Sequence, residues 1–190
     1  MTPQMIMPQP VQLRFTVDDY HKMIELGMLK DYEQAEIIEG RLIKKMTVGD
    51  RHAAVVNTLN KFLVRSVPDS VLVSIQNPIR LGDYNEPEPD VVLADLTKYD
   101  GKRHPQPTEI LLVIEVSDTT VKYDREVKLP LYAEAEIQEV WVINLPKDIV
   151  EVHRKPTVGL YQTVEIYKRG DQLQPASLPD LSMSVDEILG

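Results

Sequence analysis

The sequence predicts an α/β fold, in which strands and helices alternate along the chain to form a sheet covered by helices. Three stretches carry this prediction. Residues 110–116 are apolar at both odd and even positions, which is typical of a strand buried on both faces. Residues 50–66 place apolar side chains at helical spacing along one face. Residues 139–144 form a further apolar run of strand length.

The composition is that of an ordinary globular protein, with 190 residues, 43% of them hydrophobic and 27% charged. We expect a flexible N-terminal arm over residues 1–14 and a single domain over residues 15–190. The absence of cysteine excludes disulfides and thiolate metal sites and favours a cytoplasmic location. No stretch reaches the roughly 20 apolar residues needed to cross a bilayer, so we expect no membrane partner.

The net charge is −9, from 21 basic and 30 acidic residues. This balance opposes tight non-specific binding to polyanions, which depends on Lys and Arg contacts to phosphates. It leaves room for an acidic nuclease, because a bound Mg²⁺ reverses the charge that the substrate meets.

The N-terminal region predicts a short helix followed by a hairpin. Thr16 and Asp19 have the spacing of a capping box that begins the helix, and residues 35–43 are expected to form two strands about Glu39-Gly40. Glu36 and Glu39 are interpreted as solvated charges of an edge strand. The alternative is that one of them reaches a metal site.

The amphipathic helix over residues 50–66 carries His52 on its buried stripe, near its first turn. Two interpretations stay open: a histidine satisfied at the edge of the core, or one that faces an active-site cleft. His21, His104 and His153 lack ligand spacing such as His-x-x-x-His, so we expect no zinc site from them.

A strand over residues 71–76 ends at Asn77-Pro78, and residues 79–81 are a candidate continuation past a bulge. Pro87 and Pro89 favour an extended chain before them, so that Asp90 opens the strand 91–94. Residues 96–108 are expected to form a loop or broken helix that serves as a rim over a substrate cleft.

Residues 117–120 supply capping residues for a helix that extends to about residue 135. Asp124 and Lys128 lie four residues apart on one face of this helix, as an ion pair would. Pro130 predicts either a bend or the start of a second helix. Tyr132 on this helix is expected in the core.

The C-terminal third predicts strands over 139–144 and 149–154, a β-hairpin arm over 159–167 and a short capped helix over 184–189. Trp141 is expected to pack at the sheet edge.

The chemistry points to acidic residues held within apolar strands. Asp90 opens one strand and Glu115 lies inside another, where a carboxylate is costly unless a cation compensates its charge. Mg²⁺ prefers oxygen ligands, and the carbonyl of Val116 offers a third oxygen beside Glu115. A lysine nearby would orient a water and stabilise charge on phosphorus. Phosphate-binding glycine loops and a G-x-S-x-G nucleophile elbow are both missing from the sequence.

The ordered set of these residues resembles the restriction-endonuclease-like PD-(D/E)xK nuclease superfamily, and within it the bacterial family of putative endonucleases of uncharacterised function. The motifs that carry the resemblance are Glu36-x-x-Glu39-Gly40, His52, Glu88-Pro89-Asp90-Val91-Val92, Glu115-Val116-Ser117, Asp124-x-x-x-Lys128-x-x-x-Tyr132 and Glu139-Val140-Trp141. The resemblance implies a central mixed sheet flanked by helices, here with an extra N-terminal hairpin and a C-terminal β-arm.

It also implies hydrolysis of DNA phosphodiester bonds with Mg²⁺, for which Mn²⁺ is a substitute. Asp90 and Glu115 would bind the metal together with the Val116 carbonyl, and Glu36, Glu39, His52 and Asp124 are supporting candidates. One position departs from the superfamily pattern, because Ser117 stands where the Glu-x-Lys lysine is expected. The lysine role then passes to Lys128 on the following helix, with Lys122 as a weaker candidate.

Two other functions are compatible with the same residues. A catalytically silent module of this fold would bind nucleic acid or a protein partner, which the acidic balance and Ser117 favour. A related metal-dependent hydrolase would act on RNA. A homodimer is expected on the resemblance alone.

Overall fold

The computed structural model describes residues 12–30 and 35–190. At its centre is a six-stranded sheet with the order β3-β4-β5-β6-β7-β8. The strands are β3 (Val71–Ile75), β4 (Val91–Asp95), β5 (Ile110–Ser117), β6 (Glu139–Asn144), β7 (Ile149–Thr157) and β8 (Leu160–Lys168). β5 and β6 run parallel and the other four pairs are antiparallel, so the predicted mixed sheet is confirmed.

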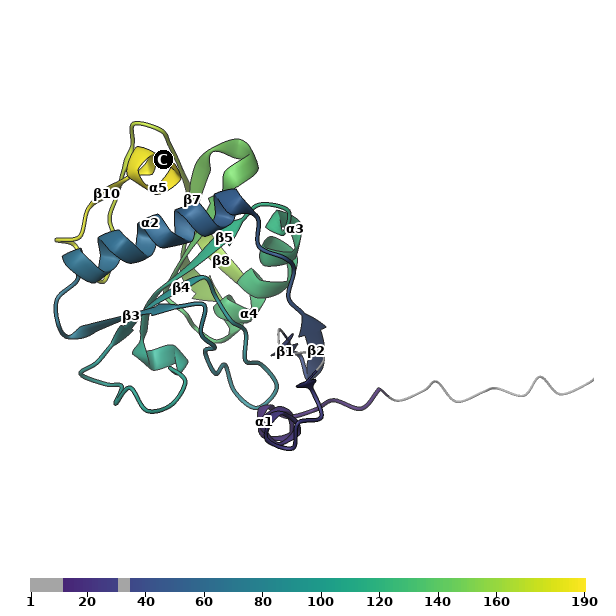
Figure 1. Cartoon of the computed structure of the whole chain (residues 1–190). Coiled ribbons are helices and arrows are strands. Elements are labelled where there is room, and N and C mark those ends of the chain that lie inside the picture. Colours follow the sequence, from purple (N-terminus) through teal and green to yellow (C-terminus); the bar gives the residue numbers. More distant parts are fainter. Residues whose placement is uncertain (1–11, 31–34) are drawn as a thin grey trace, which may run out of the picture.

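Helices cover both faces of this sheet. The α2 helix (Asp50–Ser66) and α5 (Val185–Leu189) lie together on one face (Figure 1). The α4 helix (Leu129–Glu134) packs on the other face. Alternate β5 residues serve the two layers: Ile114 packs with the α2 cluster and Val113 with the α4 cluster. This explains why the sequence of β5 is apolar at both parities.

The N-terminal elements are α1 (Val17–Glu25), β1 (Ala35–Ile38) and β2 (Arg41–Lys44), which lie at the other end of the molecule from α5 (Figure 1). The capping box of Thr16 and Asp19 is present, as predicted. The hairpin is also confirmed. At its turn, Gly40 has φ +74°, and a Cβ there would lie 2.7 Å from Arg14 Cβ. Most of the expected N-terminal arm, residues 1–11, falls outside the described residues.

The helical segment after β5 changes its winding twice. It consists of α3 (Val121–Tyr123), a π-helical turn η3 (Asp124–Lys128) and α4. In the π turn, Leu129 N–H donates to the carbonyl of Asp124, five residues back. Pro130 has no N–H to donate to Glu126, so a regular α-helix could not continue through it. A second helix therefore begins at Leu129, which is one of the two predicted outcomes.

Four details differ from the sequence-based expectations. The predicted arm over residues 159–167 is not separate, because nearly all of it lies in β8, which pairs with β7 in the central sheet. Trp141 lies in the interior strand β6 with 2% of its surface exposed, so it packs in the core and not at the sheet edge. Residues 79–81 form no strand. The predicted pair of Asp124 and Lys128 is absent, since the π turn directs each toward other partners.

The remaining elements close the fold. They are the 3₁₀ turns η2 (Pro107–Glu109) and η4 (Leu145–Lys147) and the short paired strands β9 (Gln172–Leu173) and β10 (Met183–Ser184). Ser184 caps α5, as its sequence predicts. No helix in the described part of the chain has the length and apolarity to span a membrane.

Candidate active site

A cavity of about 380 Å³ lies between β1, the first turn of α2, the start of β4, the end of β5 and the α3–η3 segment. The predicted catalytic residues Asp90, Glu115 and Lys128 all line it. Glu36, His52, Asp124 and Val116 line it as well. The fold thus brings together residues that are spread over more than ninety positions of the chain.

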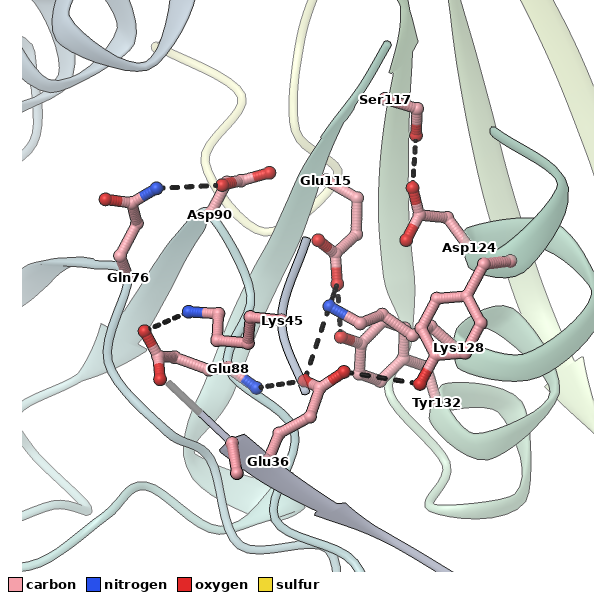
Figure 2. Close-up of polar contacts among 12 residues, drawn as sticks. Glu36, Lys45, Gln76, Glu88, Asp90, Glu115, Ser117, Asp124, Lys128 and Tyr132 are labelled. Atoms are coloured by element: carbon pink, nitrogen blue, oxygen red, sulfur yellow. Dashed lines mark hydrogen bonds and ion pairs between the residues drawn. The ribbon is translucent and has the colours of Figure 1, made fainter. Parts of the chain in front are cut away.

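Strand pairing places Asp90 beside Glu115. Val91 of β4 faces Ile114 of the antiparallel β5, so the residue before Val91 and the residue after Ile114 become cross-strand neighbours. The Asp90 carboxylate also accepts a hydrogen bond of 2.8 Å from the backbone N–H of Val116. The two carboxylates therefore leave neighbouring strands into one cavity (Figure 2).

Asp90 is held ionised by three donors. Its Oδ2 atom lies 3.0 Å from His52 Nε2, and its Oδ1 accepts from Gln76 Nε2 at 3.2 Å. Burial raises the pKa of Asp90, but the hydrogen bonds from His52, Val116 and Gln76 outweigh it and hold the pKa below its usual value. His52 therefore faces the cavity, which decides between its two predicted interpretations.

The pKa of Glu115 is shifted in the opposite direction, upward. Its side chain is 4% exposed, and burial raises its pKa to about 8. The Lys128 ammonium lowers the pKa, and the nearby Asp124 and Asp90 carboxylates add to the rise. The Glu115 Oε1 atom lies 3.2 Å from Lys128 Nζ and accepts a hydrogen bond from the Tyr132 hydroxyl. The Oε2 atom has no hydrogen bond or ion pair with the described residues.

Lys128 stands between two carboxylates from different elements. Its Nζ lies 3.2 Å from Glu115 Oε1 and 3.6 Å from Glu36 Oε2 (Figure 2). Burial lowers the pKa of Lys128, but these carboxylates outweigh it and raise the pKa above its ordinary value, so the side chain stays an ammonium. The π turn is what aims Lys128 at β5, since the residue lies at its last position.

Glu36 belongs to this site and not to a solvated edge. It is 4% exposed, and its Oε2 accepts from the backbone N–H of Glu88 at 3.1 Å. The Tyr123 hydroxyl lies 3.3 Å from its Oε1. Glu39 is the contrasting case: it is exposed in the hairpin turn and does not line the cavity, in agreement with its solvated interpretation.

Ser117, at the position where the superfamily pattern has lysine, donates a hydrogen bond of 2.7 Å to Asp124. Burial raises the pKa of Asp124. Ser117 thus fixes a carboxylate of the π turn at the cavity wall, while the ammonium comes from Lys128. Lys122 is 84% exposed and pairs with Glu126, so the structure places it outside the site.

The sequence analysis gave no role in the site to three polar residues that lie at the cavity or directly behind it. Tyr132 was expected to be core packing, and it is fully buried, but its hydroxyl donates to Glu115. Gln76 directly follows β3, with φ +50°, and donates a hydrogen bond to Asp90. Lys45, from the segment after β2, forms an ion pair with Glu88. The sequence signal for Gln76 and Lys45 was their position beside predicted strand ends, and Tyr132 had only its place in the predicted helix.

The donor set suits a hard divalent cation. Glu36, Asp90, Glu115 and Asp124 gather around one buried ammonium, so carboxylates are in excess in a largely enclosed space. Burial is the main cause of the raised pKa of Glu115, and the nearby Asp124 and Asp90 add to it, so a cation bound beside these carboxylates would favour the ionised form. Mg²⁺ takes oxygen ligands and needs only one or two carboxylates beside its waters, which Asp90 and the free Oε2 of Glu115 provide.

Comparison with known proteins identifies a family and a similar fold. The chain matches the Uma2 family, described as "Putative restriction endonuclease", over residues 17–186. It is similar to the crystal structure of a putative nuclease belonging to DUF820 from Anabaena variabilis ATCC 29413, with a TM-score of 0.69 and 18% sequence identity over 92% of this chain and 97% of that one. At this identity the likeness shows the fold. Curated proteins give no match. Because the family match spans nearly the whole chain, the protein belongs to the Uma2 family of the restriction-endonuclease-like superfamily.

Proposed function

We propose that this protein is a cytoplasmic, Mg²⁺-dependent endonuclease that hydrolyses phosphodiester bonds of DNA. The observation that carries the proposal is the convergence of Asp90 and Glu115 from paired strands, with the Lys128 ammonium 3.2 Å from Glu115. Family membership supports a nuclease activity. Mn²⁺ is expected to replace Mg²⁺, since both take oxygen ligands.

In this proposal Asp90 and Glu115 hold the cation, and the Val116 carbonyl is a candidate third ligand. When bound, Mg²⁺ supplies Lewis acidity toward the phosphate and lowers the pKa of a water. His52 and Gln76 fix the orientation of the Asp90 carboxylate by hydrogen bonds at 3.0 and 3.2 Å. A carboxylate held in this way does not have to reorganise when substrate arrives.

Lys128 acts as a donor and not as a base. Its pKa lies above the ordinary lysine value, so it carries its proton through the reaction. The ammonium orients the attacking water and offsets the negative charge that develops on the phosphate oxygens. Glu36, 3.6 Å away, holds the ammonium in place and is a further carboxylate that could accept a proton from that water.

The test is nicking of supercoiled plasmid by purified protein with Mg²⁺ or Mn²⁺. We expect Asp90→Asn and Glu115→Gln each to abolish nicking. Glu39→Gln is the matched control, because it removes an equal charge from the exposed hairpin turn. Nicking that persists in either cavity variant would assign the activity to a contaminating nuclease. Equal cleavage of RNA in the same assay would change the proposed substrate.

The second candidate function is a catalytically silent module that binds nucleic acid or a protein partner. Ser117 favours it, because the Glu-x-Lys lysine is replaced. Calorimetric titration separates the two: divalent-metal binding at the cavity supports the nuclease, and binding of DNA without any metal binding supports the silent module. A homodimer stays a prediction, which sedimentation of the purified protein would test.

A further inference from the structure

A second group of ligand-type side chains lies outside the acidic cavity. Glu86 is almost completely buried, with 1% of its side chain exposed, and its carboxylate contacts two histidines. His21 Nε2 lies 2.6 Å from Glu86 Oε1, and His104 Nδ1 lies 2.9 Å from Glu86 Oε2. The three ligand atoms all lie within 4.8 Å of one another. Among the described residues, no lysine or arginine pairs with Glu86.

Three separate parts of the chain supply this group. His21 is on α1 and Glu86 precedes β4. His104 is on the loop over residues 96–106, which is most of the 96–108 segment that was expected to rim the substrate cleft. That loop does not line the acidic cavity. With His21 it borders a different hollow, so the predicted rim is wrong. The expectation that these histidines form no metal site rested on spacing along the chain, which does not detect ligands that meet only in space.

Two imidazoles and one carboxylate are a ligand set for Zn²⁺, with a fourth position left for water. At Zn–N and Zn–O distances of about 2.0–2.1 Å, tetrahedral ligand atoms lie about 3.3 Å apart. Here the nitrogen–oxygen distances are 2.6 and 2.9 Å, each to a different oxygen of Glu86, and the three ligand atoms lie within 4.8 Å of one another. An ion therefore requires side-chain shifts of about 1–1.5 Å. Both histidine side chains are more than a third exposed and have room for this shift.

The charged side chains around the His21–Glu86–His104 group do not pair with the Glu86 carboxylate, which leaves it available to a metal ion. The hollow is also lined by Arg80 and Arg103. Arg80 pairs with Asp18 at 3.0 Å, and Arg103 forms a bidentate pair with Glu109. Both guanidinium charges are therefore matched by carboxylates other than Glu86. A buried carboxylate whose only partners are two histidines acquires a full countercharge when a dication binds.

We propose that His21, Glu86 and His104 form a binding site for Zn²⁺ or a similar borderline-soft divalent metal, distinct from the Mg²⁺ cavity. Such an ion would fasten α1 and the 96–106 loop to the segment that leads to the active site. Glu86 N–H donates to the carbonyl of Ile37 at 2.8 Å, next to Glu36, and two residues later Glu88 N–H donates to the Glu36 carboxylate. The metal would therefore act as a positioning element behind that cavity wall. Metal binding by these three residues does not depend on the protein being a nuclease.

The test is metal binding by the full, tag-free chain, since an affinity tag would itself bind zinc. Metal binding by the acidic cavity is first removed with the substitutions Asp90→Asn and Glu115→Gln. Chelator-treated protein is titrated with Co²⁺, followed by its visible absorption, and then with Zn²⁺ in competition. We expect one ion per chain, with affinity reduced at least about tenfold in a His21→Gln, His104→Gln variant. His52→Gln is the matched control, because it removes a histidine from the other cavity.

Thermal unfolding supplies a second readout. Zn²⁺ should raise the Tm of the parent protein and of His52→Gln, and leave the Tm of the His21→Gln, His104→Gln variant unchanged. The variant's metal-free circular dichroism spectrum and Tm show whether it is folded. If it is not, His104→Gln alone, on an exposed loop, is used in the same comparison. Absence of Co²⁺ and Zn²⁺ binding by the parent, or equal binding by the variant, would show that the three side chains are an ion-paired cluster only.

Discussion

The ammonium group of Lys128 lies 3.2 Å from Glu115 Oε1, although the two residues belong to different elements and Lys128 is not at the Glu-x-Lys position. The π turn and the restart of the helix at Leu129 make this contact. Ser117 instead donates a hydrogen bond to Asp124 and orients its carboxylate. The contact between Glu115 and Lys128 thus joins two different elements, while Ser117 stands where the superfamily pattern has lysine.

Lys128→Met should lower the rate of DNA cleavage by about 10²–10³-fold, because it removes a preorganised positive donor from the transition state. The measurement is the single-turnover rate of plasmid nicking at saturating Mg²⁺. Lys122→Met is the control, since that lysine is 84% exposed and faces away from the cavity. Loss of activity in the Lys122 variant with retention in the Lys128 variant would reverse the two assignments.

The affinity for Mg²⁺ should rise between pH 6 and pH 8 and level off above. The pKa of Glu115 is raised to about 8, so at lower pH its carboxyl carries a proton that the cation must displace. Titration at pH 7 in buffers of different ionisation enthalpy should show release of close to one proton per ion. The Glu115→Gln variant should show none. A pH-independent affinity in the wild type would contradict the assigned state of Glu115.

Tyr132→Phe should move the midpoint of this pH dependence upward. The Tyr132 hydroxyl donates to Glu115 and lowers its pKa, so its removal favours the protonated carboxyl. At pH 7 the affinity for Mg²⁺ should fall by roughly threefold to tenfold, as a shift of up to about one pKa unit implies. Tyr161→Phe is the control, because its buried hydroxyl donates to Ile137 and touches no cavity residue. Equal effects of both variants would indicate general loosening of the fold.

Glu151 should make stability dependent on pH in acid. Burial raises its pKa, but the nearby His153 and the hydrogen bonds from Arg125 and Asn144 outweigh it and bring the pKa to about 2, against an ordinary value of 4.5. A lowered pKa gives stability that is present above about pH 4.5 and is lost as the pH falls toward 2.

Glu151→Gln should therefore reduce the free energy of unfolding by about 1–3 kcal/mol at pH 7 and by much less near pH 2. Urea unfolding of the two proteins across this range is the measurement. A difference that stays constant from pH 7 to pH 2 would mean that the carboxylate charge does not contribute to stability.

The sequence predicted what local periodicity determines. The buried strand around Glu115 and the α2 helix follow from the spacing of their apolar residues, and the Thr16 and Ser184 caps follow from short-range hydrogen bonding. The position of Asp90 at a strand start followed from the prolines before it. These features depend on residues close together in the chain.

Features that depend on tertiary contacts were not predicted. The sequence left open whether Glu36 is a solvated edge charge or reaches the site, because its contact with Lys128 of η3 is a tertiary one. The interior place of Trp141 depends on the order of strands, which periodicity does not specify. To predict the π turn, one would have to know which face of the helix packs against β5. The contacts of His21 and His104 with Glu86 join segments 65 and 18 residues apart.

The central claim is that Asp90 and Glu115 together bind one divalent cation. Its most direct test is titration with Mn²⁺, followed by electron paramagnetic resonance, in a His21→Gln, His104→Gln background that removes the second proposed site. We predict one ion per chain, and an affinity at least about tenfold weaker after Asp90→Asn or Glu115→Gln but unchanged after Glu39→Gln. Unchanged Mn²⁺ affinity in either cavity variant would contradict a shared cation between these two carboxylates.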